Sequence, residues 1–368
     1  MEKPTRGRPD FLMLLITFTL VGFGLLMVFS TSAVSASVKY HSSFYFVNRQ
    51  ILWSVAGTIT MLFFMNVPFQ KLHKRARTIF AAALILLLLV LLVGIKINGH
   101  RSWFGVGSFG IQPTEFAKLG LLTYVASLLS KKGERIREFR NGLLPVLLII
   151  GTVAGLIMLQ PDIGSDLVIL ISTGIVVVSS GASILQIIGI GLCAVPLAVV
   201  IVFNKAYRLE RFTSFLHPWS DAQDSSYQLA QSLTAFGHGG LTGAGFGKGV
   251  EKMFYLPEAH TDFIFSTIGE ELGFIGCSVF LLLYLILIWR GLLAATRCPE
   301  PFGMYLGIGI ISTLGVQALI NLGGVTGSIP ITGVPLPLIS YGGSSLLISM
   351  ASIGILLNIS REGRIERV

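Results

Sequence analysis

Long apolar stretches separated by short polar connections form the dominant pattern of this chain. Ten stretches nearly free of charge come close to the roughly 20 residues that cross a bilayer as a helix. They span residues 11–31, 51–67, 79–95, 116–129, 143–159, 167–180, 184–203, 274–289, 304–322 and 336–359. The pattern predicts an all-α, polytopic membrane protein with ten transmembrane helices, in which residues 1–368 form a single integral membrane domain.

The composition agrees with this class. The chain is 53% hydrophobic and 12% charged, with a mean hydropathy of +0.78, whereas soluble domains carry about 25% charged residues. A water-soluble globule is therefore excluded. The three cysteines (Cys193, Cys277 and Cys298) show neither a disulfide framework nor metal-ligand spacing.

The basic residues predict how the chain is oriented. With the N-terminus inside, the predicted inner segments hold seventeen Lys and Arg residues, and the short outer loops hold four. Cytoplasmic loops carry such an excess of positive charge. We therefore predict that both termini are cytoplasmic and that one long extracytoplasmic loop, residues 204–262, joins helices seven and eight. The net charge of +9 is then a topology signal, and no nucleic-acid partner is expected.

Most loops that carry acids, aromatic residues or Pro and Gly fall on the outer side of this topology. They are residues 98–113, 160–165, 204–262 and 323–335. A site built from several of them would face outward, which argues against a cytosolic nucleotide as substrate.

Residues 256–265 place Glu258, His260 and Asp262 just before an apolar helix. Glu270 and Glu271 follow where that helix should enter hydrocarbon, and a carboxylate there costs at least about 2.5–3.5 kcal/mol unless it faces protein or water. We therefore predict that the helix start lines a polar cavity with Asp262 at its rim. The alternative is that Asp262 is the N-cap of this helix and that Glu258 and His260 are solvated loop residues.

The pair Glu115 and Lys118 follows Arg101 and Trp103 and begins just after Pro113, a residue suited to the first turn of a helix. Three residues apart, Glu115 and Lys118 share one helical face. They form either a local ion pair beside an interfacial tryptophan anchor, or, with Arg101, a cationic patch that neutralises phosphate beside an acid. The spacing alone does not choose between these interpretations.

Two further outer segments allow a structural and a functional interpretation. In the tight turn 160–166, Asp166 is the favoured N-cap of the next helix, and Asp162 has no such ready structural role. The seven glycines between 237 and 249 would let backbone N–H groups approach a phosphate, but no Walker pattern accompanies them. A flexible loop is the favoured interpretation there.

The last outer segment, residues 327–345, contains three prolines within eight residues. Broken backbone at membrane depth is tolerated only where it is buried in protein or lines a cavity. Nearby, Gln317 and Asn321 lie four residues apart, a spacing typical of hydrogen bonding between helices.

At these motifs the chain resembles the SEDS family (shape, elongation, division and sporulation proteins), which includes FtsW, RodA and SpoVE. The resemblance runs from about Asp10 to Arg361. Its matching stretches are Arg101–Trp103, Gln112–Lys118, Gln160–Gly164, Leu256–Gly276 and Gly333–Ser345. Residues 252–255 and 325–330 are more similar to the FtsW and SpoVE branch than to RodA.

The resemblance implies a peptidoglycan glycosyltransferase that polymerises lipid II, a disaccharide-pentapeptide on undecaprenyl diphosphate, outside the cytoplasmic membrane for cell division or sporulation. It implies a cognate class B penicillin-binding protein and other divisome or sporulation membrane proteins as partners. It makes Asp262 the catalytic carboxylate and the candidate general base. The candidate substrate-binding residues are Trp103, Arg101, Glu115, Lys118, Asp162, Glu258, His260, Lys252 and Ser344.

This chemistry agrees with the residue types. A carboxylate can take the proton of an attacking sugar hydroxyl, and cations stabilise a departing diphosphate. A divalent cation, Mg²⁺ or Mn²⁺, could share the diphosphate role, although no metal-ligand spacing appears. The alternative is a lipid II flippase. Transporters often contain inverted repeats and paired broken helices, whereas this sequence shows no convincing repeat and its polar loops gather on one face.

Overall fold

The computed structural model describes residues 7–97, 100–105, 110–203, 215–219 and 226–362. The fold is mostly helical, and each of the ten predicted stretches overlaps a helix. These helices are α1 (Phe11–Tyr40), α2 (Tyr45–Asn66), α3 (Phe69–Val93), α4 (Pro113–Lys132), α5 (Leu144–Met158), α6 (Ile163–Ser179), α7 (Ile184–Phe203), α10 (Ile264–Thr296), α11 (Pro301–Val325) and α12 (Gly343–Ser360). Six of the described helical stretches are long and apolar enough to cross a membrane: α1, α3, Phe139–Met158, α10, α11 and α12. The helical class and the multi-pass membrane character are therefore confirmed.

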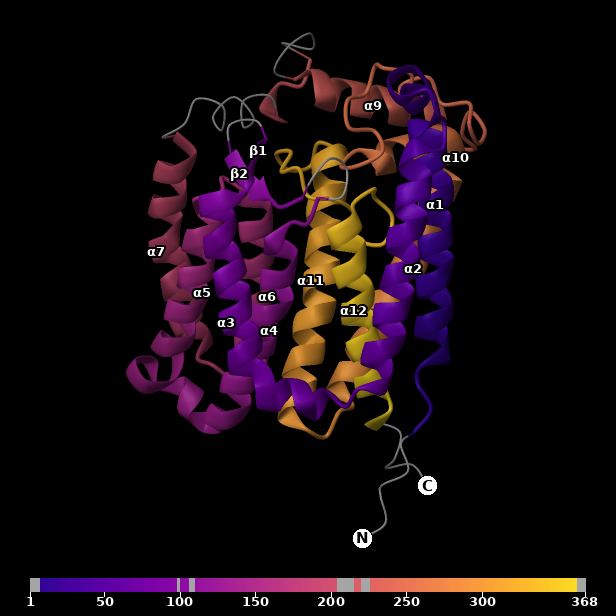
Figure 1. The fold of residues 1–368 in the computed structure, drawn as a ribbon. Helices are drawn as coiled ribbons and strands as arrows, with labels where there is room; N and C mark the ends of the chain where they lie inside the picture. Colours follow the sequence, from indigo (N-terminus) through magenta and orange to yellow (C-terminus); the bar gives the residue numbers. More distant parts are fainter. Residues whose placement is uncertain (1–6, 98–99, 106–109, 204–214, 220–225, 363–368) are drawn as a thin grey trace.

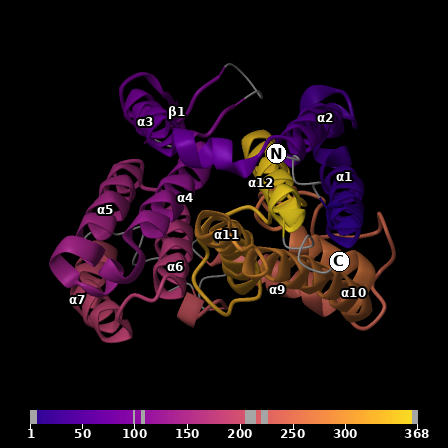
Figure 2. The same ribbon diagram turned by 90° about the horizontal axis from the view of Figure 1, so that it is seen from below.

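The helices stand side by side in one bundle, with α11 and α12 in its middle (Figures 1 and 2). The most apolar stretch of α12 is 83% buried, and that of α11 is 67% buried. Helix α12 packs on α2, while α11 packs on α4, α6 and α10. The polar segments that precede and follow these two helices are therefore held by neighbours on several sides.

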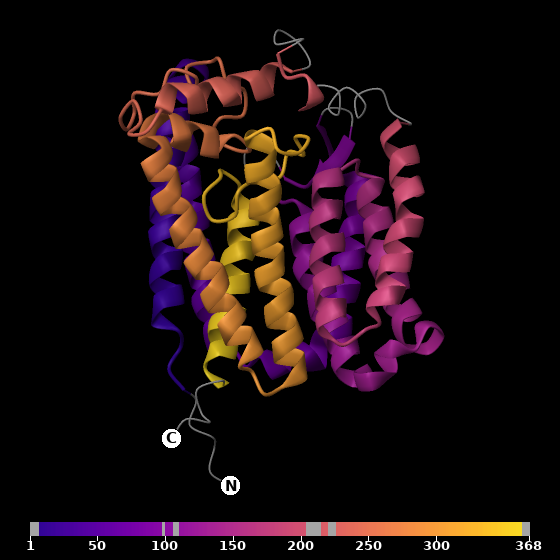
Figure 3. The same cartoon turned by 180° about the vertical axis from the view of Figure 1, so that it is seen from behind.

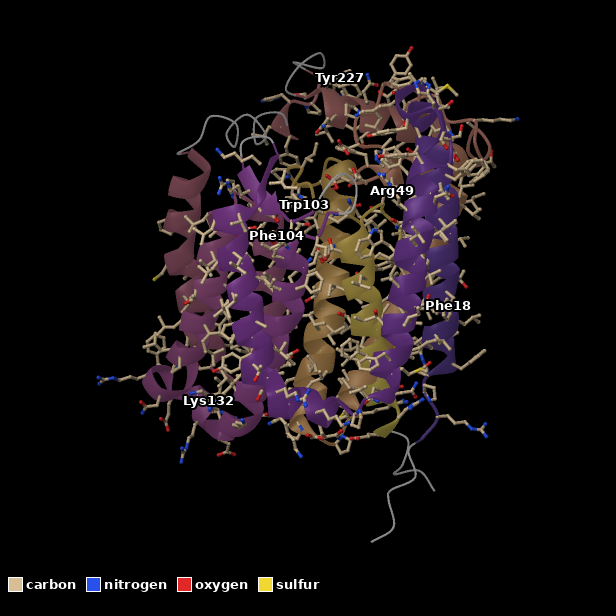
Figure 4. The ribbon with its side chains drawn as sticks, in the orientation of Figure 1. Phe18, Arg49, Trp103, Phe104, Lys132 and Tyr227 are labelled. Atoms are coloured by element: carbon tan, nitrogen blue, oxygen red, sulfur yellow. The ribbon has the colours of Figure 1, made fainter. Side chains whose placement is uncertain are left out.

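The two ends of the bundle differ in character. At one end α1 begins and α12 ends, and the Asp10 amide donates to Ser360 Oγ at 3.1 Å. At the other end α9 (Tyr227–Gly239) lies across the helices (Figure 3). Trp103 lies near this second end, and Lys132 lies at the first (Figure 4). Within the predicted long loop, residues 204–214 and 220–225 lie outside the described residues.

Some predicted boundaries were wrong. A short antiparallel hairpin, β1 (Ile95–Ile97) and β2 (His100–Trp103), follows α3. Helix α12 begins at Gly343 instead of residue 336, because the proline-rich segment before it is not helical. Helix α10 begins at Ile264, just after Asp262 as predicted, and so extends ten residues ahead of the charge-free span; it contains one non-helical residue, Gly273, at φ 65°. A Cβ at Gly273 would lie 2.3 Å from the amide nitrogen of Gly243, so only glycine permits this close approach.

Two shorter helical turns complete the described fold on the side opposite α9. They are η1 (Gly133–Arg137), a 3₁₀ turn, and η2 (Phe139–Leu143), a π turn that leads directly into α5. Both follow Lys131 and Lys132 at the end of α4. This strongly basic connection lies at the end of the bundle where the sequence predicts the cytoplasm.

Candidate functional site

The non-helical segment between α11 and α12, residues 329–342, is the centre to which most candidate residues connect. Two amide side chains of α11 hold it in place. Gln317 Nε2 donates to the Pro335 carbonyl at 3.0 Å, and Asn321 Nδ2 donates to the Val334 carbonyl at 2.8 Å. Both residues thus bond the broken backbone of this central segment. The prediction that they form hydrogen bonds between helices is confirmed for Gln317, which also accepts from Lys118 of α4, whereas Asn321 Nδ2 donates to main-chain carbonyls.

The chain around Asp262 is fixed to the central segment through its main chain. Asn321 Nδ2 also donates to the Asp262 carbonyl at 2.7 Å, and Ser340 Oγ donates to the Thr261 carbonyl at 2.6 Å. The Tyr341 amide donates to the His260 carbonyl at 2.9 Å. Three successive carbonyls are thus held, which fixes the position from which the Asp262 side chain extends.

Asp262 lines a small pocket beside the central segment. The residue is partly exposed, and a Cβ added at Gly333 would lie 3.5 Å from Asp262 Oδ2. The pocket is lined by Asp262, Phe263, Asn321, Gly324, Thr332 and Gly333, among others. The N-cap of α10 is Phe263, without a side-chain cap bond. Helix capping is therefore not the role of Asp262.

Glu115 and Lys118 form the predicted local ion pair, at 2.8 Å between Lys118 Nζ and Glu115 Oε1. Both side chains are buried, and Lys118 Nζ also donates to Gln317 Oε1 at 2.9 Å. Gln317 in turn binds Pro335, so one side chain links Lys118 to the central segment. The pair lines a small pocket together with Thr313, Gln317, Ser349 and Ser352, among others.

Asp162 and Ser344 meet at Gln112, on the other side of the central segment. Gln112 Nε2 donates to Asp162 Oδ2 at 3.2 Å, and the Gln112 amide donates to Ser344 Oγ at 3.3 Å. Asp162 Oδ1 accepts from the Ser165 amide at 3.0 Å, which makes Asp162 the N-cap of α6. The prediction that Asp166 is the cap was wrong. Asp166 is buried in the first turn, and neither of its carboxylate oxygens has a hydrogen-bond partner among the described residues.

Arg101 and Trp103 lie on β2, at the edge of this arrangement. The Arg101 guanidinium donates to the carbonyls of Leu91 and Leu92 at the end of α3, a favourable position for a cation. The ring of Trp103 covers Gly110, where a Cβ would lie 2.8 Å from Trp103 Cε3. Arg101 and Lys118 thus have different partners. The predicted cationic patch is not seen as a contact between these two residues.

Lys252 belongs to a separate buried cluster. Its ammonium pairs with Glu271 and donates to Ser30 Oγ at 2.8 Å. Glu270 Oε1 accepts from the Val250 amide at 2.6 Å, and both glutamates are fully buried. The prediction that they line a polar cavity was therefore wrong. They bind the glycine-rich loop, so several of its amides are already occupied and are not available to a phosphate.

Glu258 and His260 differ in their surroundings. Glu258 is exposed and its Oε2 accepts from Thr261 Oγ1 at 2.9 Å. The ring of His260 packs beside Phe46 and Tyr341, with centroid separations of 4.5 and 5.5 Å. Burial lowers the pKa of His260 below its ordinary value; Glu258 opposes this shift, and Lys39 adds to it.

The lowered pKa of His260 predicts a loss of stability in acid. A folded state that binds the proton less tightly than the unfolded chain is stabilised above the ordinary pKa of about 6.5 and loses this contribution as the pH falls below it. We expect the melting temperature of the purified protein to fall between about pH 7.5 and 5.5, and less steeply for His260→Gln. Equal slopes for the two proteins would contradict this role.

Lys118 allows structural and chemical roles to be separated. Lys118→Ala removes the positive charge and leaves Glu115 buried without its partner, which typically costs about 3–5 kcal/mol. Lys118→Arg keeps the charge. If charge at this position supports activity, we expect Lys118→Arg to retain part of the activity that Lys118→Ala loses, measured as glycan formation from lipid II at equal protein amount. Failure of both variants to accumulate in membranes would favour a purely structural ion pair.

Gln112 and Ser340, which help to hold this arrangement together, were not predicted as site residues. They bond backbone or side chains of segments far away in the chain, and nothing in their local spacing distinguishes them from other polar residues. Among the described residues, no group of three or more His, Cys, Asp or Glu side chains is arranged to hold a metal ion. The divalent cation therefore stays a prediction.

Comparisons with known proteins match almost the whole chain. The family model of FtsW, RodA and SpoVE, described as cell cycle protein, matches residues 11–365. Stage V sporulation protein E of Bacillus subtilis (strain 168) is 44% identical over 358 residues, which cover 97% of this chain and 98% of that protein. A probable peptidoglycan glycosyltransferase FtsW of Geobacter sp. (strain M18) is 41% identical over 357 residues, 96% of this chain and 97% of that protein.

Solved structures give the same result. A chain from a study of the structural coordination of polymerization and crosslinking by a peptidoglycan synthase complex superposes with a TM-score of 0.79 at 32% identity, covering 97% of this chain and 98% of that one. The rod shape-determining protein RodA of Thermus thermophilus superposes with a TM-score of 0.72 at 31% identity and the same coverage. The resemblance first seen in the motifs therefore extends through sequence and fold, and the chain belongs to the FtsW, RodA and SpoVE family.

Proposed function

We propose that this protein is a peptidoglycan glycosyltransferase that polymerises lipid II at the outer face of the cytoplasmic membrane. Its FtsW relatives carry the name of this activity, and they match nearly its full length. The observation that carries the proposal is the placement of Asp262. Hydrogen bonds to the carbonyls of residues 260–262 fix its main chain, and the residue lines a pocket.

In the proposed reaction, Asp262 is the general base. It takes the proton of the 4-hydroxyl of one sugar as that oxygen bonds to the anomeric carbon of another. The bond from that anomeric carbon to the diphosphate oxygen breaks, and the lipid diphosphate leaves with the electron pair. Arg101 and Lys118 are the candidate cations for the departing charge, and a divalent cation, Mg²⁺ or Mn²⁺, would supply further neutralisation.

The other candidates take supporting roles in this proposal. Asp162 and Ser344, joined through Gln112, border the central segment from the side of α6 and α12. A Cβ at Gly164 would lie 2.3 Å from Val334 Cγ2, so the turn after Asp162 packs closely against the central segment. These residues would therefore support the central segment that lines the Asp262 pocket, while Trp103, Glu258 and His260 would contact the sugar and peptide of the substrate.

The proposed topology has ten crossings, with both termini cytoplasmic and the Asp262 side outside. It predicts that a protease site inserted near Gln223, in the long loop before α9, is cut from outside in intact protoplasts. A matched site in the basic turn after Lys132 should be cut only after the protoplasts are lysed. The reverse pattern would overturn the outward-facing site.

We further propose a cognate class B penicillin-binding protein as partner, in cell division or sporulation. The support is the superposition on a chain from a peptidoglycan synthase complex, together with the sporulation and FtsW relatives. Other divisome or sporulation membrane proteins would join this pair.

The decisive experiment supplies purified protein, with and without the partner, with labelled lipid II in detergent. Glycan strands are the expected product. Because a detergent micelle has no second leaflet, a lipid II flippase would give no product there. Absence of strands from the protein with its partner, together with transfer of lipid II across vesicle membranes, would replace the enzyme with the flippase.

A further inference from the structure

The glycine-rich loop that follows α9, residues 240–250, exposes large apolar side chains. Leu241 is 71% exposed, Phe246 is 51% exposed and Val250 is 50% exposed. Lys248 lies between them and is also exposed. The connection between α9 and α10 lies at the outer edge of the molecule, away from the bundle axis, in two opposite views (Figures 1 and 3). These apolar side chains therefore face the surroundings of the bundle and not its interior.

More than half of the backbone amides of this loop have partners inside the protein. Glu270 and Glu271 supply most of them, through their carboxylates and their main-chain carbonyls, and three close glycine contacts bring the loop onto α10. The amides bound in this way or within the loop are those of Gly243, Ala244, Gly245, Gly247, Lys248, Val250 and Glu251. Internal partners for backbone groups are what a lipid environment demands, whereas a protein partner or water could supply hydrogen bonds of its own.

The exposed side chains of the loop continue an apolar face of α10. The Phe274 amide donates to the Gly240 carbonyl at 2.9 Å, and the Ile275 amide donates to the Leu241 carbonyl at 3.1 Å. Phe274 and Ile275 are more than half exposed, as is Leu282 two turns further along. The loop thus sits at the upper limit of a helix surface that crosses the membrane.

The lengths of α1 and α10 between two shared contacts indicate the depth of the loop in the membrane. At the inner end, Arg290 of α10 pairs with Asp10 just before α1. At the outer end, Ser30 of α1 donates to Glu271 of α10 at 2.6 Å. Phe11 to Ser30 and Glu271 to Arg290 are each separated by nineteen residue-to-residue steps, or about 29 Å at 1.5 Å per residue. Because the hydrocarbon core is about 30 Å thick, the loop bound by Glu271 lies at its outer boundary.

We propose that residues 240–250 form a lipid-contacting element, seated among the glycerol groups and upper acyl chains of phospholipids in the outer leaflet. Leu241, Phe246 and Val250 enter the apolar side of this boundary. Lys248 extends its ammonium to the phosphates, since long basic side chains reach the interface in this way. The element fixes the height of the start of α10 and of Asp262 just before it. On the proposed function, this sets the carboxylate near the diphosphate of a membrane-held substrate.

The test measures depth in vesicles of phosphatidylethanolamine and phosphatidylglycerol. An environment-sensitive fluorophore is attached to Phe246→Cys in a Cys193→Ser background, because Cys193 is exposed and the other two cysteines are buried. Matched probes are Leu282→Cys on the mid-membrane face of α10 and Ser42→Cys, which is exposed beyond the outer end of α1. Thermal unfolding in detergent verifies that each labelled variant folds like its parent.

We expect lipids with a nitroxide near the headgroup end of the chain to quench the Phe246 probe several-fold more than lipids labelled deep in the chain. The Leu282 probe should show the reverse order, and the Ser42 probe should be quenched by neither. A Phe246 probe that behaves like the Ser42 probe overturns the proposal. So does loss of lipid quenching at Phe246 when a co-purified class B transpeptidase is added, since the loop would then be a protein interface. Because the readout is fluorescence, failure here is separate from failure of the glycosyltransferase assay.

Discussion

Asp262→Asn should yield a folded protein that is almost inactive in strand formation. Loss of a positioned general base typically costs about 10²–10⁴-fold in rate, and asparagine cannot accept a proton at neutral pH. Folding should be spared because the hydrogen bonds that hold residues 260–262 go to main-chain carbonyls, which the substitution leaves in place. The measurement is the rate of glycan formation from labelled lipid II by purified protein with its partner.

The matched control for this variant is Asp10→Asn, the same chemical change at the other end of the bundle. Asp10 is the N-cap of α1 and pairs with Arg290. Asparagine caps a helix about as well as aspartate does, and its side-chain oxygen can still accept from Arg290. We therefore expect a lower melting temperature from the lost charge, with activity per folded molecule kept within a few-fold. Thermal unfolding and partner binding are compared for both variants. If Asp262→Asn polymerises lipid II at nearly the parental rate, Asp262 is not the base.

The helices could be located from the sequence because the requirement for apolar residues in a membrane is local. The partners of the two glutamates in α10 could not be identified in the same way. Glu270 and Glu271 looked like a polar cavity lining, since a carboxylate at that depth needs a polar neighbour. Their neighbours are Lys252, loop amides about 20 residues earlier, and Ser30, which lies 241 residues away from Glu271 in the chain. Partners that distant leave no periodicity to follow.

The candidate site, too, could be predicted from the sequence only in part. The prolines of residues 327–345 correctly predicted broken backbone, and the structure places Asp262 in the lining of a pocket. The residues that gather the site could not be predicted, because an amide such as Asn321 bonds main-chain carbonyls, and any residue type can present one. Asp162 and Asp166 were equally plausible caps by spacing. The bond from Gln112 and the close packing at Gly164 set where the helix begins.

Lys252 provides the second large effect, on stability. Lys252→Met keeps an unbranched chain of similar length and removes the charge, which leaves the fully buried carboxylate of Glu271 unpaired. Removing one member of a buried pair typically costs about 3–5 kcal/mol. We expect the variant to unfold at a markedly lower temperature than the parent protein and to lose activity because less of it is folded.

A double variant separates the structural role of Lys252 from a role in binding the diphosphate. Lys252→Met combined with Glu271→Gln removes both charges, and replacing a whole buried pair by neutral groups is often close to neutral in stability. The side-chain amide introduced by Glu271→Gln can still bond Ser30 and the Gly247 amide, the other partners of the original carboxylate. If Lys252 acts only through Glu271, stability and strand formation should recover together. A double variant that is as stable as the parent but does not polymerise lipid II would show that the ammonium acts on the substrate.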